Sequence, residues 1–351
     1  MLKRPYQKAE VSFDLQQEIG HEGSNSKVHI AHDTQLDAQL VIKSVPKMEF
    51  DSVDVFFDEA RILYLSIHPH VVPIHYACED ADNIYIAMPY YARGSLGMLL
   101  NQRFLTVREI VKVGCQIASG LHNVHSKRLI HFDTKPDNIL LNDRGEAVLS
   151  DFGLARRMNL SGAAEQDRMY FKMLPPEVHT GLEFTNRYDI YQFGLTLYRM
   201  SVGDVAFNEQ FDGYGPKNAF NRDQFKFDVR NGRFPARDAY PEHIPQRLRR
   251  LIAKCLEPNP QDRFSAVIDV CNELAQIDAR LDWQYANVTG SRSWVCRDES
   301  NEREFRLEVQ ANGASRAQKT MLASGRTTAI KDYCKPELKS ADIKRFLENH
   351  P

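Results

Sequence analysis

The sequence contains no apolar run long enough to span a bilayer. Its first residues, Met-Leu-Lys-Arg-Pro-Tyr-Gln-Lys, lack the apolar stretch of a secretory signal peptide. Neither sign of charge is in large excess, because 45 Lys and Arg face 47 Asp and Glu and the formal net charge is -2. Such a balance gives no overall attraction to a polyanion. We therefore expect a cytoplasmic protein that binds neither a membrane nor nucleic acid.

Closely spaced cysteine pairs are also missing. No C-x-x-C pattern occurs, and the six cysteines are irregularly spaced: Cys78, Cys115, Cys255, Cys271, Cys296 and Cys334. In a chain of this size the pattern favours buried free thiols over a disulfide framework or a zinc site. His122 and His125 have helical spacing, but nothing nearby completes a metal site, so we expect a structural role for both.

Polar residues of the types used in catalysis and metal binding are instead concentrated in residues 129–156. This segment reads L-I-H-F-D-T-K-P-D-N-I-L-L-N-D-R-G-E-A-V-L-S-D-F-G-L-A-R. Asp133 is followed five places later by Asn138, and Asp151 opens Asp-Phe-Gly. Phosphoryl transfer needs a carboxylate near the attacking hydroxyl and oxygen ligands for Mg²⁺. A polar turn between strands would explain any one of these residues, but not the whole set.

This set resembles the catalytic and metal-binding loops of the eukaryotic-type protein kinase family, including its bacterial and phage-borne members. The resemblance implies ATP and Mg²⁺ as cofactors and proteins as substrates. It implies that Asp133 orients the acceptor hydroxyl and accepts its proton, and that Lys135 stabilises charge on the transferred phosphoryl group. Asn138 and Asp151 are the implied Mg²⁺ ligands, and Leu140 is expected to line the nucleotide site.

An upstream segment, residues 19–28, resembles the family's glycine-rich loop, whose backbone N–H groups cover the nucleotide phosphates. The resemblance is imperfect, because Gly20 lies one residue too far from Val28 and Ser26 stands where the third glycine would be. A hairpin turn is the alternative. The residues of this segment implied in nucleotide binding are Gly20, Gly23, Ser26 and Val28.

Lys43 follows at the expected distance in Leu-Val-Ile-Lys, at the end of a predicted strand. The resemblance implies that it holds the α- and β-phosphates and that Glu59, on a predicted helix over residues 53–66, braces it. Asp58 is the alternative partner of Lys43. A strand over residues 83–88 then leads to a hinge, where Met88 and Tyr90 are expected beside the adenine.

Further motifs follow in the second half of the resemblance. Thr106 and Glu109 form a capping box that predicts a helix reaching about residue 126. Residues 175–177, Pro-Pro-Glu, resemble the family's Ala-Pro-Glu, and Arg263 is the implied buried partner of Glu177. Phe132 stands where most members carry an Arg that pairs with a loop phosphate, so we do not expect activation through that contact.

The expected fold is α+β: a two-lobed protein kinase fold with a small β-rich N-terminal lobe, a large helical lobe and an appended α+β unit. The expected boundaries are an extension over 1–12, the two lobes over 13–88 and 89–282, and the appended unit over 283–351, called the tail below. In the tail we predict strands at 293–297, 304–310 and 327–333 and a helix at 341–349 capped by Ser340. Ser265 is predicted to cap a last kinase helix over 266–279.

The predicted function is ATP- and Mg²⁺-dependent phosphorylation of protein Ser and Thr hydroxyls, with tyrosine or dual specificity left open. Lys135 resembles the Ser/Thr pattern, whereas Tyr170 replaces the Thr typical of those enzymes and Lys172 is similar to the tyrosine kinase pattern. A pseudokinase scaffold is the main alternative, and a small-molecule kinase is disfavoured by Glu177 and Arg263. The tail is expected to bind a regulatory partner.

Overall fold

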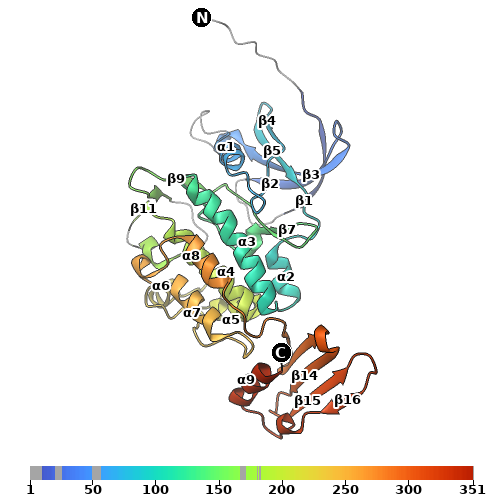
Figure 1. Cartoon of the computed structure of the whole chain (residues 1–351). Helices are drawn as coiled ribbons and strands as arrows, with labels where there is room; N and C mark the ends of the chain where they lie inside the picture. The colour runs from blue at the N-terminus through green and yellow to red at the C-terminus, as the bar shows by residue number, and fades with distance from the viewer. Residues whose placement is uncertain are drawn as a thin grey trace, which may run out of the picture.

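The structure is a computed structural model that describes residues 10–19, 26–49, 57–166, 171–179, 181 and 183–350. An N-terminal sheet with one helix, a larger helical lobe and the tail follow one another, and the tail lies at the end of the helical lobe opposite the N-terminal sheet (Figure 1). This is the two-lobed α+β arrangement that the motifs predict. Within the described ranges, no helix has both the length and the apolar character needed to cross a membrane.

The N-terminal lobe is a five-stranded antiparallel sheet with strand order β1-β2-β3-β5-β4. Its strands are β1 (Phe13–Ile19), β2 (Lys27–Asp33), β3 (Ala38–Pro46), β4 (Tyr76–Glu79) and β5 (Asn83–Pro89), and its helix is α1 (Asp58–Leu65). A short 3-10 helix, η1 (Lys47–Glu49), follows β3. One side of α1 packs against the core through its buried residues Ala60, Ile62 and Leu63. The predicted loop residues Gly20 and Gly23, and the predicted first residues of the helix, lie outside the described residues.

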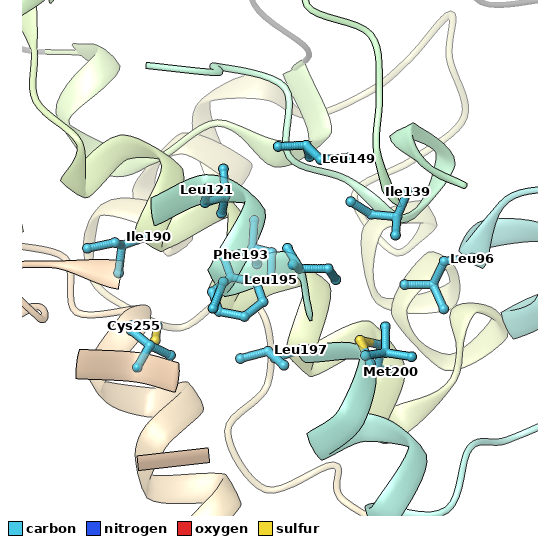
Figure 2. Packing of buried hydrophobic residues seen from close by; sticks show 14 of the residues in the cluster. Leu96, Leu121, Ile139, Leu149, Ile190, Phe193, Leu195, Leu197, Met200 and Cys255 are labelled. Carbon is cyan, nitrogen blue, oxygen red and sulfur yellow. The ribbon is translucent and has the colours of Figure 1, made fainter. Parts of the chain in front are cut away.

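The helical lobe is built around α4 (Arg187–Val202), in which every residue after Arg187 is buried. Figure 2 shows Phe193, Leu195 and Leu197 of this helix packed among apolar side chains of neighbouring elements, including Leu121 and Cys255. The surrounding helices are α2 (Leu96–Gln102), α3 (Val107–Ser126), α5 (Asp204–Asp212), α6 (Arg222–Arg230), α7 (Gln246–Cys255) and α8 (Val267–Leu274).

Helix α3 begins with the predicted capping box. Thr106 Oγ1 accepts a hydrogen bond from the Glu109 backbone N–H at 3.2 Å, and Glu109 Oε2 accepts one from the Thr106 N–H at 2.9 Å. The prediction for α8 is wrong at both ends. The helix stops at Leu274, and Ser265 does not cap it, because its hydroxyl donates to Asp269 Oδ2 at 3.2 Å instead.

Short strand pairs and 3-10 turns connect these helices near the predicted catalytic residues. β6 (Leu129–Ile130) pairs with β9 (Arg156–Arg157), β7 (Ile139–Leu141) with β8 (Ala147–Leu149), and β10 (Ala164–Glu165) with β11 (Glu183–Phe184). The turns are η3 (Pro136–Asn138), η4 (Phe171–Met173), η5 (Pro176–His179) and η6 (Pro260–Asp262).

The tail is an antiparallel sheet in simple sequence order with one helix, α9 (Ser340–Asn349). Its strands are β12 (Gln284–Val288), β13 (Ser291–Asp298), β14 (Arg303–Val309), β15 (Ser315–Met321) and β16 (Thr327–Ala329), with turns η7 (Glu299–Asn301) and η8 (Lys331–Tyr333). Trp283, Trp294 and Phe346 are fully buried in a core of its own. Alternate residues of β14 enter this core, as expected of a sheet covered on one face.

Two tail predictions need correction. The strand predicted over 327–333 ends at Ala329, because the chain then turns through η8 and places the Tyr333 ring against Phe346, with ring centroids 5.0 Å apart. Ser340 is the first residue of α9 rather than its cap, and Lys339 precedes it without a side-chain cap. The strands β12 and β15 were not predicted.

The tail meets the helical lobe through an aromatic joint, which we define as Phe104, His243 and Tyr285. The Tyr285 ring lies edge-on to Phe104 at 4.7 Å and stacks on His243 at 5.3 Å between centroids. Gln284 Nε2 donates to the Phe104 carbonyl at 2.9 Å, and Arg292 pairs with Glu242 at 2.8 Å. Burial lowers the pKa of His243 to about 3, so the joint contains a neutral imidazole at physiological pH.

Candidate active site

Lys43 stands between two carboxylates that come from different parts of the chain. Strand β3 presents its ammonium group 2.7 Å from Glu59 Oε1 on α1 and 2.9 Å from Asp151 Oδ1. Asp58, the alternative partner, instead pairs with Arg61 one helical turn away. A Cβ on Gly153 would lie 3.2 Å from Lys43 Nζ, so a residue without a side chain suits this position. The helix register therefore selects Glu59.

Lys43 and Asp151 stabilise each other's charged forms, whereas burial raises the pKa of Glu59. Lys43 lowers the pKa of Asp151 to about 2, so that this carboxylate is ionised throughout the physiological range. Burial would lower the pKa of Lys43, but Asp151 and Glu59 outweigh it and raise that pKa. Asp151 has φ of 59°, a left-handed conformation that costs energy for a residue with a side chain. The fold thus holds an ionised carboxylate in a strained position at the end of β8.

The loop that carries Asp133 is held in place by hydrogen bonds to polar side chains of α4. Asp189 Oδ2 and Oδ1 accept the backbone N–H groups of His131 and Phe132, each at 2.8 Å. Gln192 accepts the Thr134 N–H at 2.9 Å, and Thr196 donates to the Thr134 carbonyl at 3.2 Å. Residues three and four apart on a helix share a face.

These three α4 residues were missed by the sequence reasoning. The signal that could have found them is their helical spacing within an otherwise apolar helix, since buried polar side chains require partners. His125 completes the support, with Nε2 2.8 Å from Asp189 Oδ2.

Asp133, Lys135 and Asn138 form a compact polar group. Lys135 Nζ lies 3.0 Å from Asp133 Oδ2, and Asn138 Nδ2 donates to the same oxygen at 2.7 Å. Asp133 Oδ1 is buried and has no hydrogen-bond partner among the described residues. Burial raises the pKa of Asp133, although Lys135 opposes the effect. A buried carboxylate oxygen without a partner is costly unless a ligand uses it.

The hairpin β7–β8 brings the two predicted metal ligands to the same end. Asn138 immediately precedes β7 and Asp151 follows shortly after β8, and antiparallel strands place these positions side by side. The Ser150 N–H and hydroxyl both donate to the Asn138 carbonyl, at 2.9 and 3.0 Å. His131 links the two loops further, because its Nε2 lies 3.1 Å from the Ser150 carbonyl and its ring packs edge-on to Phe152 at 4.6 Å.

The other described residues that were predicted to bind the nucleotide make fewer contacts with the charged groups of the site. Val28 pairs directly with Lys43 across β2 and β3. Ser26, Met88 and Leu140 are half-buried, and Tyr90 is exposed. The structure therefore brings together Lys43, Glu59, Asp133, Lys135, Asn138 and Asp151, and it leaves these other positions as predictions.

Arg263 and Glu177 are joined as the motifs imply. Two parallel hydrogen bonds of 2.7 Å connect the guanidinium to the carboxylate. Arg263 also donates to the Arg187 carbonyl at 3.0 Å and lies over the Tyr191 ring at 4.7 Å. Such a fork geometry, with the Arg side chain fully buried, fixes residues 175–177 on the helical lobe.

The family model described as protein kinase domain matches residues 13–275 of this chain. Among curated proteins, a probable serine/threonine-protein kinase of Clostridium acetobutylicum is 27% identical over 282 residues, covering 76% of this chain and 40% of the relative. The serine/threonine-protein kinase PknK of Mycobacterium tuberculosis is 30% identical over 284 residues, covering 79% of this chain and 24% of the relative. PknD of Chlamydia muridarum, also named a serine/threonine-protein kinase, is 25% identical over 325 residues, with coverages of 82% and 32%. The matches thus span less than half of each relative.

Proposed function

We propose, from the premise that this chain belongs to the protein kinase family, that it transfers the γ-phosphoryl group of ATP to Ser and Thr hydroxyls of proteins. The observation that carries the proposal is Asp133 Oδ1, a buried carboxylate oxygen for which the described residues supply no hydrogen-bond partner, whereas Asp133 Oδ2 is held by Lys135 and Asn138. The hydroxyl group of the protein substrate, which accepts the phosphoryl group, would donate a hydrogen bond to this oxygen.

Each residue of the site has a separate role that follows from its position and charge. Asp133 orients the acceptor hydroxyl and accepts its proton, and its raised pKa makes it a better base than an exposed Asp. Lys135 stands beside it to stabilise negative charge on the phosphoryl group in transfer. Lys43 binds the other phosphates, and Glu59 keeps its ammonium group in place.

The donor set near β7 and β8 fits a hard divalent cation, for which we propose Mg²⁺. Asp151 offers an ionised carboxylate and Asn138 an amide oxygen, both of the ligand type that Mg²⁺ prefers. The Asn138 amide nitrogen is used by Asp133, which leaves the amide oxygen for the metal. Bound there, the cation would neutralise phosphate charge.

The relatives named as serine/threonine kinases favour Ser and Thr as acceptors. Lys135, two residues after Asp133, supports the same assignment. Lys172, the residue similar to the tyrosine kinase pattern, contacts Asn208 and the rings of Phe207 and Phe211. Phosphoamino acid analysis of a labelled protein substrate distinguishes the acceptors, and phosphotyrosine as the main product would overturn this choice.

The central test compares Asp133→Asn with Asp143→Asn, a control in the exposed turn between β7 and β8. Asp133→Asn removes the base and should reduce turnover by at least about 10²-fold while nucleotide affinity changes little. Asp143→Asn should behave as wild type. Initial rates with labelled ATP and equilibrium nucleotide binding are the measurements. Unchanged turnover in Asp133→Asn contradicts the assignment, and wild-type protein that binds ATP without turnover would favour the pseudokinase alternative.

We further propose that the tail, residues 283–351, is an appended domain that binds a regulatory partner, next to lobes at 13–88 and 89–282 of a cytoplasmic enzyme. Its separate core around Trp283 and Trp294 supports this division. A chain ending at Asp282 should keep basal activity but melt at a lower temperature, because Phe104 and His243 lose the cover of Tyr285. Loss of both folding and activity would show that the tail is structural.

A further inference from the structure

Two cysteines face each other where α3 and α8 pack together. Cys115 Sγ lies 3.8 Å from the Cys271 carbonyl oxygen, and Cys271 Sγ lies 3.9 Å from the Cys115 carbonyl oxygen. The reciprocal contacts place each thiol against the other residue. Gly114 explains the close approach, because a Cβ there would lie 3.0 Å from side-chain atoms of both Leu274 on α8 and Leu197 on α4.

The other four cysteines lie on separate elements. Cys78 is in β4, Cys255 in α7, Cys296 in β13 and Cys334 directly after η8. Cys115 and Cys271 are both free thiols and both half-buried, so a small reagent can reach them. Proximity and access are the two requirements for a reversible cross-link between thiols.

We propose that Cys115 and Cys271 are a modification site that closes into a reversible disulfide and takes an oxidant of the peroxide class. One thiolate attacks an oxygen of hydrogen peroxide and the O–O bond breaks. The hydroxide that leaves takes up the proton that the thiol had released, which gives a sulfenic acid and the first water. The second thiol then attacks the sulfenic sulfur, its proton passes to the departing hydroxyl group, which leaves as the second water, and the S–S bond forms. The two sulfur atoms together lose two electrons, and the peroxide gains them.

Burial and the neighbouring Cys271 raise the pKa of the Cys115 thiol to about 12, so little thiolate is present at neutral pH. Closure is therefore slow, and the pair responds to sustained oxidation rather than to a brief pulse. A thiol reductant reverses it by exchange.

The position of the pair gives the cross-link a structural effect. At the start of α3, the Arg108 N–H donates to the Leu281 carbonyl at 2.9 Å and the Arg108 side chain pairs with Asp282, where the tail begins. At its other end, α3 leads directly to β6 and the loop of Asp133. The disulfide would join positions 156 residues apart in the sequence and fasten these two helices to each other.

The test uses the full-length folded protein, treated with graded hydrogen peroxide and then alkylated under denaturing conditions. Peptide mass mapping should find a peptide pair that joins Cys115 to Cys271 and lacks two hydrogens, and dithiothreitol should remove it. Cys115→Ser and Cys271→Ser should each abolish this pair, whereas the controls Cys78→Ser and Cys334→Ser should retain it. The oxidised wild type should melt a few degrees higher than the reduced protein.

Wild-type mapping decides the proposal even if a serine variant folds poorly. Native protein that shows oxidised Cys334 but no Cys115–Cys271 link would overturn it. Equal formation of the link in urea-unfolded protein would also overturn it, because the proposal depends on the folded contact. The mass readout is independent of turnover, so its failure and the failure of the proposed kinase activity are distinguishable.

Discussion

The two ends of the activation segment, defined here as residues 151–177, differ in how much charge contributes to their attachment to the helical lobe. The first end packs through apolar side chains around Phe132. The second end, called the charged end below, also packs through Met173 and Phe171, but it is held in addition by the buried ion pair of Glu177 and Arg263. Apolar packing offers nothing for a phosphate to bind, whereas charged groups respond to new charge. We therefore expect added charge to affect the second end more than the first.

The apolar end is a cluster formed by Ile130, Phe132, Ala164, Phe184 and Tyr188, with Leu154 and Met158 packed against it. Phe132 is fully buried, and its ring lies edge-on to Tyr188 at 4.9 Å and to Phe184 at 6.0 Å. Because Ala164 and Phe184 also pair across β10 and β11, the cluster joins the loop of Asp133 to the segment. Phe132 thus attaches the loop of Asp133 to the segment by packing.

The largest expected effect comes from Arg263→Ala, which removes the ion pair with Glu177 at the charged end. Glu177 would keep its charge in a largely buried position without its partner, which should lower the free energy of unfolding by about 3–5 kcal/mol. Urea unfolding measures the loss. The control is Arg247→Ala, whose partner Glu273 is exposed, and it should cost less than about 1 kcal/mol. Equal losses in the two variants would mean that the buried pair contributes no more than an exposed one.

Breaking the apolar end with Phe132→Ala should cost about 3 kcal/mol of unfolding free energy, because a fully buried ring leaves a cavity. Turnover should fall with it, since Asp133 is the next residue. Phe132→Leu keeps most of the volume and should cost about 1 kcal/mol. Both variants retain a Cβ, so the φ of 67° at this position is equally strained in all three proteins. If Phe132→Ala unfolds at the wild-type urea concentration, the cluster does not hold the segment.

Lys172→Met measures how much the ammonium group of Lys172 contributes to the attachment of the charged end. The substitution keeps an apolar chain against Phe207 and Phe211 but removes the ammonium group that lies 4.7 Å from the Phe211 ring centroid. We expect a loss of about 1 kcal/mol of unfolding free energy, the size of a partly buried cation–π contact. Lys217→Met, at an exposed loop position, is the matched control and should be neutral. A Lys172→Met protein as stable as wild type would show that the ammonium group does not contribute to the attachment of this end.

The smallest effect is expected from removing phosphate. Phosphatase-treated and untreated wild-type protein should differ in initial rate by less than about fivefold, or roughly 1 kcal/mol of barrier. The reason is that the apolar end needs no phosphate to hold it. Ser161 is exposed and is one candidate acceptor, and Tyr170, the other, lies outside the described residues. A hundredfold drop, restored by phosphorylation at either residue, would mean that another basic residue has replaced the missing Arg.

Much of the site could be predicted because its residues lie in short local motifs. The sequence around Asp133, Asn138 and Asp151 fixes their spacing, and the structure places them on one loop and one hairpin. The support from Asp189 and Gln192 could not be read in the same way, since it depends on contacts between segments more than fifty residues apart. The apolar surroundings of Phe132 are equally non-local. Its lack of charge could be read from the sequence, but not its partners Phe184 and Tyr188.

The tail was the least predictable region. β14 was predicted, whereas β15 carries mostly polar residues and has Ala317 as its one fully buried side chain. A strand whose pattern is weak is recognised only when its neighbours are known, because pairing supplies what the side chains do not. The aromatic joint was not predicted either, since Phe104 and Tyr285 are far apart in the chain.

The aromatic joint has a consequence for the binding role proposed for the tail, should the bound polypeptide also be a substrate. A flexible linker gives a tethered ligand a broad range of distances and a modest effective concentration. Here Tyr285 is held between Phe104 and His243, so a polypeptide bound to the tail would be presented at one fixed span from Asp133. Only polypeptides whose docking segment and acceptor are separated by a matching length would gain from the attachment. A substrate-docking role for the tail would therefore require a fixed spacing between docking segment and acceptor.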